Sequence, residues 1–300
     1  MIFFELLHGL LAVLMLVLLI PVLFFTLQCW FGLIASRKQQ HFADVVPDAS
    51  ANDILVLIPA HDEMLVIGNT LDMLLPQLKS TDRLLVVADN CHDDTASIVT
   101  ARQQQVMIRN NTQQVGKSYA LAFGMDAIRD KPPAILLIVD ADCQVLPDFI
   151  EQIRQQVMRT GLPAQADNLM YPPADVPISV SVKISAFAVL VKNRIRMHGM
   201  NQLAGHVPLL GTGMAFPWQT IESMPLANAE IAEDIYLGLQ LVLKQQGAQF
   251  AANAALVSAL PTDNETQKGQ RERWEQGHID LIRRMLPSLL KQAWHKRSWP

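Results

Sequence analysis

Three apolar runs in the first half of the sequence end in polar residues that could do chemistry. The runs are Ile54–Ile58, Leu84–Ala88 and Ile135–Val139, and each is continuously apolar, as is typical of strands buried on both faces of a sheet. Ligands of open α/β sheets bind beyond the carboxyl ends of the strands, so we expect the residues that follow the runs to share one site. These residues are His61, Asp62 and Glu63 after the first run, Asp89 and Asn90 after the second, and Asp140 and Asp142 after the third.

Asp140 and Asp142 have the spacing D-x-D in a predicted turn. Two such carboxylates can bind one hard cation, Mg²⁺ or Mn²⁺. A cation that bridges the phosphates of a nucleoside diphosphate would stabilise the charge on this leaving group. The alternative is that both residues only end a strand and cap a turn, as aspartate often does. The spacing by itself does not distinguish the two.

A second acidic pair, Glu233 and Asp234, precedes the helical pattern Ile235–Leu243. One of these carboxylates could act as a general base that deprotonates an acceptor hydroxyl. The positive end of the helix dipole would then favour its ionised form. The same dipole supplies the alternative explanation, because acids are common at helix N-termini without any catalytic role.

Gln270, Arg273 and Trp274 fall on one side of a further predicted helix. An arginine can pair with a phosphate, and a tryptophan offers a stacking face to a sugar or base. An ordinary charged helix face beside a packed tryptophan is the alternative.

The elements that would position these residues alternate between strand and helix, which is the pattern of an α/β fold with a largely parallel sheet. After Phe149 the alternation weakens, and we expect a proline-containing loop from Gly161 to Pro177 and then an apolar helix around Ile184–Val191. The other predicted elements are helices at Leu65–Leu78, Thr95–Gln104 and Ser118–Ile128 and a short strand at Val106–Arg109.

The segment Leu6–Ser36 contains no Asp, Glu, Lys or Arg and is long enough to cross a bilayer, which needs ~20 apolar residues. We expect Pro21 to kink this helix without ending it. A cleaved signal peptide is the alternative, but Glu5 stands where such a peptide carries basic residues. Arg37 and Lys38 follow the segment, so the positive-inside rule places the rest of the chain in the cytoplasm, on the inner membrane of the cell.

The composition excludes some classes of protein. A formal net charge of −4 over 300 residues argues against a nucleic-acid-binding protein, whose surface would be basic. Three widely spaced cysteines suggest no disulfide framework and fit a reducing compartment.

Taken in order, the motifs resemble those of the family-2 glycosyltransferases, a GT-A-fold group that includes cellulose synthase and hyaluronan synthase. The resemblance runs from about Ile54 to about Leu290. It rests on the segments VLIPAHDE, VVADNCHDDT, GKSYAL, DADCQV, GTGMAF, EIAED and QRERW, in this order. One departure is Ala88, which replaces the first acid of the family's second motif, while Asp93 matches a later one and Cys91 stands in for a serine.

The resemblance implies a role for each motif residue. Ala60 and Glu63 would line the nucleotide pocket, Asp89 would hydrogen-bond a uracil, Lys117 would contact phosphate, Asp140 and Asp142 would hold the metal, and Asp234 beside Glu233 would be the base. Gly211, Thr212 and Gly213 would face donor and acceptor, and Gln270, Arg273 and Trp274 would complete that side of the site.

The expected organisation has four parts. They are an anchor at 1–36, a linker at 37–52, a GT-A domain at 53–277 with a nucleotide-binding half (53–150) and an acceptor half (151–277), and an interfacial amphipathic segment at 278–300 with Trp294 and Trp299.

The expected function is inverting transfer of a sugar from a nucleotide sugar, with a UDP-sugar favoured, to a glycan or lipid-linked acceptor in cell-envelope or exopolysaccharide synthesis. The partners would be membrane lipid and proteins of a polysaccharide synthesis system, with no nucleic acid. Two alternatives are a polyprenyl-phosphate glycosyltransferase and an inactive nucleotide-sugar-binding membrane subunit. The paired acids at 233–234 count against the first, since an anionic acceptor needs no base, and the intact acids of the site count against the second.

Overall fold

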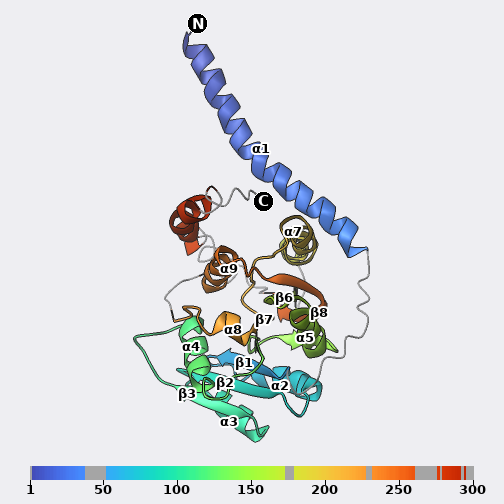
Figure 1. Ribbon diagram of the computed structural model, residues 1–300, viewed down its shortest axis with the longest axis vertical. Helices are drawn as coiled ribbons and strands as arrows, with labels where there is room; N and C mark the ends of the chain where they lie inside the picture. The colour runs from blue at the N-terminus through green and yellow to red at the C-terminus, as the bar shows by residue number, and fades with distance from the viewer. Residues whose placement is uncertain are drawn as a thin grey trace.

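The computed structural model describes residues 2–37, 52–172, 179–227, 232–260, 276–277, 279–291 and 294. Figure 1 shows an α/β body below one long N-terminal helix, α1 (Ile2–Ser36). The predicted linker and the residues Gln270, Arg273, Trp274 and Trp299 lie outside the described residues, apart from the first and last residues of the linker.

The body is built on an eight-stranded mixed sheet in the order β3-β2-β1-β4-β7-β6-β8-β5. The pairings β1–β2, β1–β4, β2–β3 and β6–β8 are parallel, and β4–β7, β6–β7 and β5–β8 are antiparallel. The strands are β1 (Ile54–Ala60), β2 (Arg83–Asp89), β3 (Gln105–Arg109), β4 (Ile135–Ile138), β5 (Gln144–Val145), β6 (Ala164–Tyr171), β7 (Met214–Pro217) and β8 (Gln249–Ala259).

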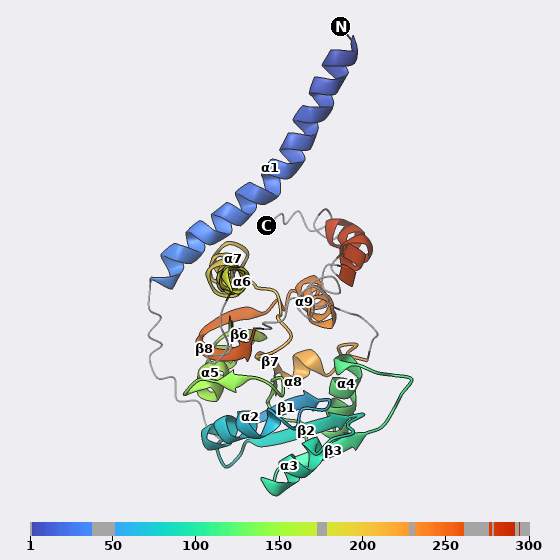
Figure 2. The ribbon, with the colours of Figure 1, turned by 180° about the vertical axis from the view of Figure 1, so that it is seen from behind.

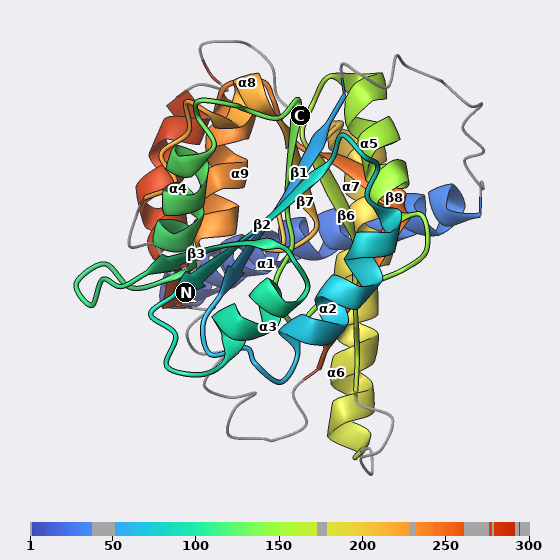
Figure 3. The ribbon, with the colours of Figure 1, turned by 90° about the horizontal axis from the view of Figure 1, so that it is seen from below.

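Helices cover both faces of the sheet and enclose a hydrophobic core on each. On one face lie α2 (Ile67–Leu74), the short helix η2 (Leu75–Gln77), α3 (Thr95–Ala101) and α5 (Phe149–Thr160). On the other lie α4 (Lys117–Ala127), α7 (Arg196–Ala204), α8 (Trp218–Ile221) and α9 (Glu233–Leu243). Figure 3 shows α2, α3 and α5 on the opposite side of the strands from α4 and α9. The predicted α/β architecture is confirmed.

The elements predicted before Phe149 are confirmed with shifts of a few residues at their ends. The prediction of a loop from Gly161 to Pro177 is wrong, because Ala164–Tyr171 forms β6 between β7 and β8. This strand contains Gln165, Asp167 and Asn168, whose polar side chains are typical of a loop. Each of these side chains is buried and hydrogen-bonded to another element, which offsets part of the cost of burying it, although Asp167 Oδ1 has no partner and burial raises the pKa of Asp167 to about 6.

The apolar helix after β6 is longer than expected and is interrupted. It begins at α6 (Val180–Leu190), capped by the Ser179 hydroxyl, passes through a π-helical segment, η3 (Val191–Ile195), and continues as α7. Such π segments are rare and often lie at functional sites.

Among the described residues, α1 is the helix long and apolar enough to cross a membrane, over Leu7–Ser36, with a mean hydropathy of 3.0. Length and composition are the only grounds for this statement, and a signal sequence would meet them too. The helix is continuous through Pro21, as expected. Its apolar side chains up to Leu27 are exposed, whereas Gln28 and Ala35 near its end are buried against the body.

Candidate active site

The loops after β1 and β2 are tied together by hydrogen bonds. The Glu63 amide donates to the Thr95 hydroxyl at 2.8 Å, and that hydroxyl donates to Asp93 Oδ1 at 2.5 Å. Asp93 also accepts from the Met64 amide at 2.9 Å. Asp93, which the family resemblance singled out, therefore fixes the backbone that carries Glu63.

Asp62, Cys91 and Asp93 have potential ligand atoms within 4.8 Å of one another. The Asp62 Oδ1 atom already accepts from the His92 amide at 2.6 Å, and the Asp62 amide donates to Cys91 Sγ at 3.4 Å. These bonds close the two loops on each other, so the cluster has a structural explanation.

Asp89 ends β2 and is buried. Its Oδ1 atom accepts from Arg109 at 2.6 Å, and both side chains are less than a tenth exposed. Arg109 also lies over the ring of Tyr119, 5.8 Å from its centroid. The ion pair holds the Asp89 carboxylate in place at the sheet edge, beside the buried end of β1 at Ala60.

Lys117, the first residue of α4, connects the nucleotide-binding half of the predicted domain to the acceptor half. Its ammonium group forms an ion pair with Asp140, which follows β4, and donates to the Gly211 carbonyl at 2.7 Å. Burial opposes the charge of Lys117, but Asp140, Glu233 and Asp234 together raise its pKa above the ordinary value. Lys117 is therefore charged and lies among carboxylates.

The Gly211–Gly213 loop lies against this lysine. Gly211 and Gly213 have φ values of +84° and +64°, a region that glycine adopts without strain. A Cβ on Gly213 would lie 2.8 Å from Ala166 Cβ, so the close approach to β6 also requires glycine. Between them, the Thr212 hydroxyl accepts from the Asp140 amide at 3.0 Å and fixes the turn that begins the D-x-D motif.

Gln165 is a positioning residue that the sequence analysis missed. It is fully buried in β6, its amide nitrogen donates to the Thr212 carbonyl at 2.9 Å, and its side-chain oxygen accepts from the Leu210 amide at 2.9 Å. It holds the glycine loop from both sides. No local pattern marks this role, because Gln165 and the loop are 45 residues apart.

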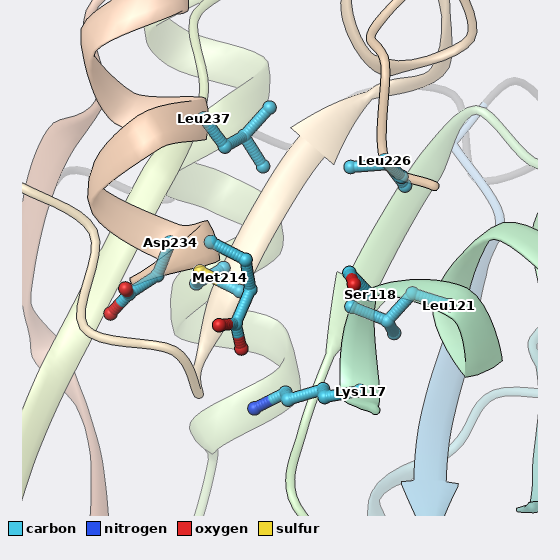
Figure 4. A pocket seen from close by; sticks show the side chains of 8 residues that line it. Lys117, Ser118, Leu121, Met214, Leu226, Asp234 and Leu237 are labelled. Carbon is cyan, nitrogen blue, oxygen red and sulfur yellow. The ribbon is translucent and has the colours of Figure 1, made fainter. Parts of the chain in front are cut away.

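Glu233 and Asp234 begin α9, as predicted, and face the same lysine. Figure 4 shows the Lys117 side chain below Asp234, at a pocket lined on its other sides by Leu121, Met214, Leu226 and Leu237. Burial raises the pKa of Glu233, and Asp234 raises it further. Burial also raises the pKa of Asp234, so here desolvation outweighs the helix dipole that we expected to favour the ionised form.

The structure thus brings together carboxylates from three separate segments, which are the loop after β1, the turn after β4 and the start of α9. Burial raises the pKa of Glu63, and Asp142 and Asp140 raise it further. Burial followed by Asp140 raises the pKa of Asp142. The carboxylates Glu63, Asp140, Asp142, Glu233 and Asp234 therefore repel one another around Lys117.

This donor set fits a divalent cation. Mg²⁺ and Mn²⁺ prefer carboxylate oxygens, and the repulsion from neighbouring carboxylates that adds to burial in raising the pKa values of Glu63 and Asp142 is one that a cation would relieve. Asp140 and Asp142 follow a central strand on a turn fixed by Thr212, so they are the best-placed ligands.

Lys192 is a second residue that the sequence analysis did not identify. It lies on η3, close enough to Asp234 for each charge to favour the other. Burial nevertheless lowers its pKa below the ordinary value.

Two family models match the chain. The glycosyl transferase family 2 model matches residues 55–173, and the glycosyl transferase family group 2 model matches residues 135–299, more than half of the chain. Over 116 residues the chain is 28% identical to an uncharacterized protein of Methanocaldococcus jannaschii, and the match covers 39% of this chain. The chain spans about half the length, 46%, of this curated relative.

Several solved structures share the fold at low sequence identity. A mannosyltransferase of Pyrobaculum calidifontis in complex with GDP-Man and Mn²⁺ is 19% identical, with a TM-score of 0.59 over 86% of this chain and 72% of that one. Glucosyl-3-phosphoglycerate synthase of Mycobacterium tuberculosis, in complex with Mn²⁺, UDP and phosphoglyceric acid, is 19% identical, with a TM-score of 0.51 over 78% of each chain. A mycobacterial protein gives a TM-score of 0.53 at 20% identity, over 83% of this chain and 82% of that one.

Proposed function

The chain belongs to glycosyl transferase family group 2 and has the GT-A fold, as the order of its motifs predicted, and from this premise we propose that it is a membrane-anchored, inverting glycosyltransferase. It transfers a sugar from a nucleoside diphosphate sugar to an acceptor hydroxyl. The observation that supports this most directly is the convergence of Lys117, the D-x-D pair and the Glu233–Asp234 pair from three segments at one edge of the sheet.

The donor side is formed by residues of the first half. Asp140 and Asp142 would hold a divalent cation, which when bound neutralises charge on the leaving diphosphate. Lys117 supplies a second positive charge beside them. Asp89 and Ala60, at the ends of neighbouring strands, and Glu63 would surround the nucleoside. The structural neighbours with GDP-Man and with UDP support a nucleotide-sugar donor, and a UDP-sugar remains our choice.

The acceptor side is formed by residues of the second half. Asp234 is the proposed base, because its raised pKa makes it a stronger proton acceptor than an exposed aspartate. Lys117 lies between Asp234 and the D-x-D pair, so the base and the leaving group would occupy opposite sides of the sugar. Gly211, Thr212 and Gly213 would line the space between donor and acceptor, with Gln270, Arg273 and Trp274 beside them.

The anchor is part of the proposal. The exposed apolar part of α1, residues 7–27, would rise about 30 Å at 1.5 Å per residue, the thickness of a bilayer core. The domain boundaries of the sequence analysis remain proposals, as does a role in cell-envelope or exopolysaccharide synthesis with partner proteins.

The direct test uses the full chain in detergent or nanodiscs with a panel of UDP- and GDP-sugars and Mn²⁺. We expect slow release of nucleoside diphosphate from one donor without acceptor. An inactive nucleotide-sugar-binding subunit would bind a donor and release nothing. A chain that neither binds nor hydrolyses any of these donors would contradict the proposed function.

A further inference from the structure

The π-helical segment η3 joins the anchor, the sheet and the active site. The side-chain amide of Asn193 donates to the backbone carbonyl of Asn168 in β6 at 3.0 Å, and Arg194 forms an ion pair with Asp167 of the same strand at 2.6 Å. On its other side, η3 packs so closely against α1 that a Cβ added to Gly32 would lie 1.9 Å from the Ile195 carbonyl oxygen. These contacts fix η3 between α1 and β6, and with it the position of Lys192.

Lys192 keeps part of its surface exposed to solvent, although the protein around it desolvates it enough to lower its pKa, and it lies within the electrostatic reach of Asp234. It is therefore a cation on the acceptor side of the site, separate from Lys117, whose partners are Asp140 and the Gly211 carbonyl. An anionic group bound at Lys192 would lie near the proposed base without occupying the position of the leaving diphosphate.

Helix α6, which leads into η3, exposes an apolar surface. Val180, Ile184 and Phe187 recur at helical spacing on one face and are 73%, 63% and 64% exposed. Exposed apolar surface of this kind marks contact with a membrane or another apolar partner. Lys192 follows Phe187, the last residue of this face, by little more than one helical turn.

The same side of the body carries other apolar surfaces. Figures 1 and 2 show the α6–α7 segment and a C-terminal helix, described over residues 279–291, on the side of the body that faces α1. In that helix Leu281 and Met285 are buried beside α9, whereas Ile279, Ile282, Leu286 and Leu290 are exposed. Helix α6 thus lies on the same side of the body as the helix that would cross the bilayer.

We propose that Lys192 binds the phosphate of an amphiphilic acceptor whose hydrocarbon chain lies along Val180, Ile184 and Phe187 of α6. The inference rests on the proposed function and narrows its acceptor to a membrane lipid that carries a phosphate close to its attacking hydroxyl. The phosphate matches the charge of Lys192, the chain matches the apolar face, and the hydroxyl is the group that Asp234 deprotonates.

The test is photolabelling of the full chain in phosphatidylcholine nanodiscs. The probe is an alkyl phosphate with a diazirine in its chain, and an alkyl alcohol of equal length with the same diazirine is the phosphate-free control. We expect the phosphate probe to label residues 180–196 in the wild type, with at least about fivefold less labelling in Lys192→Gln. Lys183→Gln, an exposed lysine of the same helix, is the matched variant and should label as the wild type does. The alcohol should label all three proteins equally.

Three results would overturn the inference. They are equal labelling of Lys192→Gln and the wild type by the phosphate probe, labelling confined to segments outside residues 180–196, and labelling of the wild type by the phosphate probe that is no stronger than labelling by the alcohol. Nucleotide affinity should be unchanged in Lys192→Gln, and a large loss would place Lys192 in the donor site instead. Labelling does not require turnover, so failure of this inference is distinct from failure of donor hydrolysis in the wild type.

Discussion

At the scale of single residues, the site contains more carboxylates than cationic groups, and two lysines partly neutralise the carboxylates near them. Lys117 is shared between Asp140 and the pair at the start of α9, so it connects the two halves of the site, and it is also the phosphate contact that we propose. The carboxylates that keep raised pKa values, Glu63, Asp142, Glu233 and Asp234, are those best suited to take up a cation or a proton.

The first prediction concerns the base. Asp234→Asn keeps the size of the side chain but cannot accept a proton, so turnover should fall ~10²–10⁴-fold, the usual contribution of general-base catalysis, while nucleotide affinity stays near normal. Asp89→Asn, which weakens the ion pair with Arg109, should instead reduce donor affinity more than the rate of transfer. Nucleotide Kd and transfer rate, measured for both variants, separate these roles. Wild-type turnover in Asp234→Asn, or a failure due only to lost donor binding, would show that the base is another residue.

The second prediction concerns the metal. Asp142 is partly desolvated but keeps an exposed surface, and it follows the turn that Thr212 fixes, so Asp142→Ala should abolish metal-dependent turnover with little change in the thermal midpoint. Turnover as a function of Mn²⁺ and the melting curve are the two measurements, and the exposed Asp130→Ala is the matched control. Full activity of the wild type in EDTA is the outcome incompatible with this role.

At the scale of elements, the joint between α1 and α7 depends on two glycines that let the helices touch. A Cβ on Gly199 would lie 1.8 Å from the Gln28 carbonyl oxygen, and the Gly32 contact to η3 is equally close. The Arg196 guanidinium donates to the Gln28 side-chain oxygen at 2.7 Å beside this crossing. The anchor is thus packed directly on the segment that presents Lys192 to the site.

The third prediction tests this joint. Gly199→Ala must separate the helices, and overpacking of this kind costs ~1–3 kcal/mol. The thermal midpoint should therefore fall by several degrees, at roughly 2–4 °C per kcal/mol. Gly9→Ala is the control within α1, because a Cβ there meets nothing within 4 Å. Equal midpoints for the two variants would mean that the helices do not pack as closely as the structure shows.

At the scale of the whole molecule, the apolar helix, the α6 face and the C-terminal helix give the body one side suited to a membrane. Lys192 lies on η3, which packs against α1, and Figure 1 shows α9, the helix that Asp234 begins with Glu233, on the side of the sheet that faces α1. A soluble donor would then approach from the aqueous side and a lipid acceptor from the bilayer.

The fourth prediction concerns topology. Residues after Arg37 should lie in the cytoplasm, where nucleotide sugars are made, because basic residues follow the anchor. A reporter that is active only in the periplasm, fused after Trp299, should give no signal, and the same fusion with a cytoplasmic reporter is the control. A strong periplasmic signal would reverse the orientation.

The sequence by itself determined the long apolar helix α1, the strands β1, β2 and β4, and the start of α9, because these depend on local apolar periodicity and on acids at element ends. It also determined the order of the motifs, and hence the family. Local patterns extend over a few residues, so they identify the carboxylates one segment at a time.

Tertiary structure decided which side chains meet. β6 was missed because its polar residues find partners far along the chain, such as Gln165 with the loop at Leu210 and Asp167 with Arg194. The contact of Lys117 with Gly211, 94 residues away, and the position of Lys192 near Asp234 have the same origin. A buried polar group is stable only when it is paired, and its partner here is supplied by the fold and not by the neighbouring sequence.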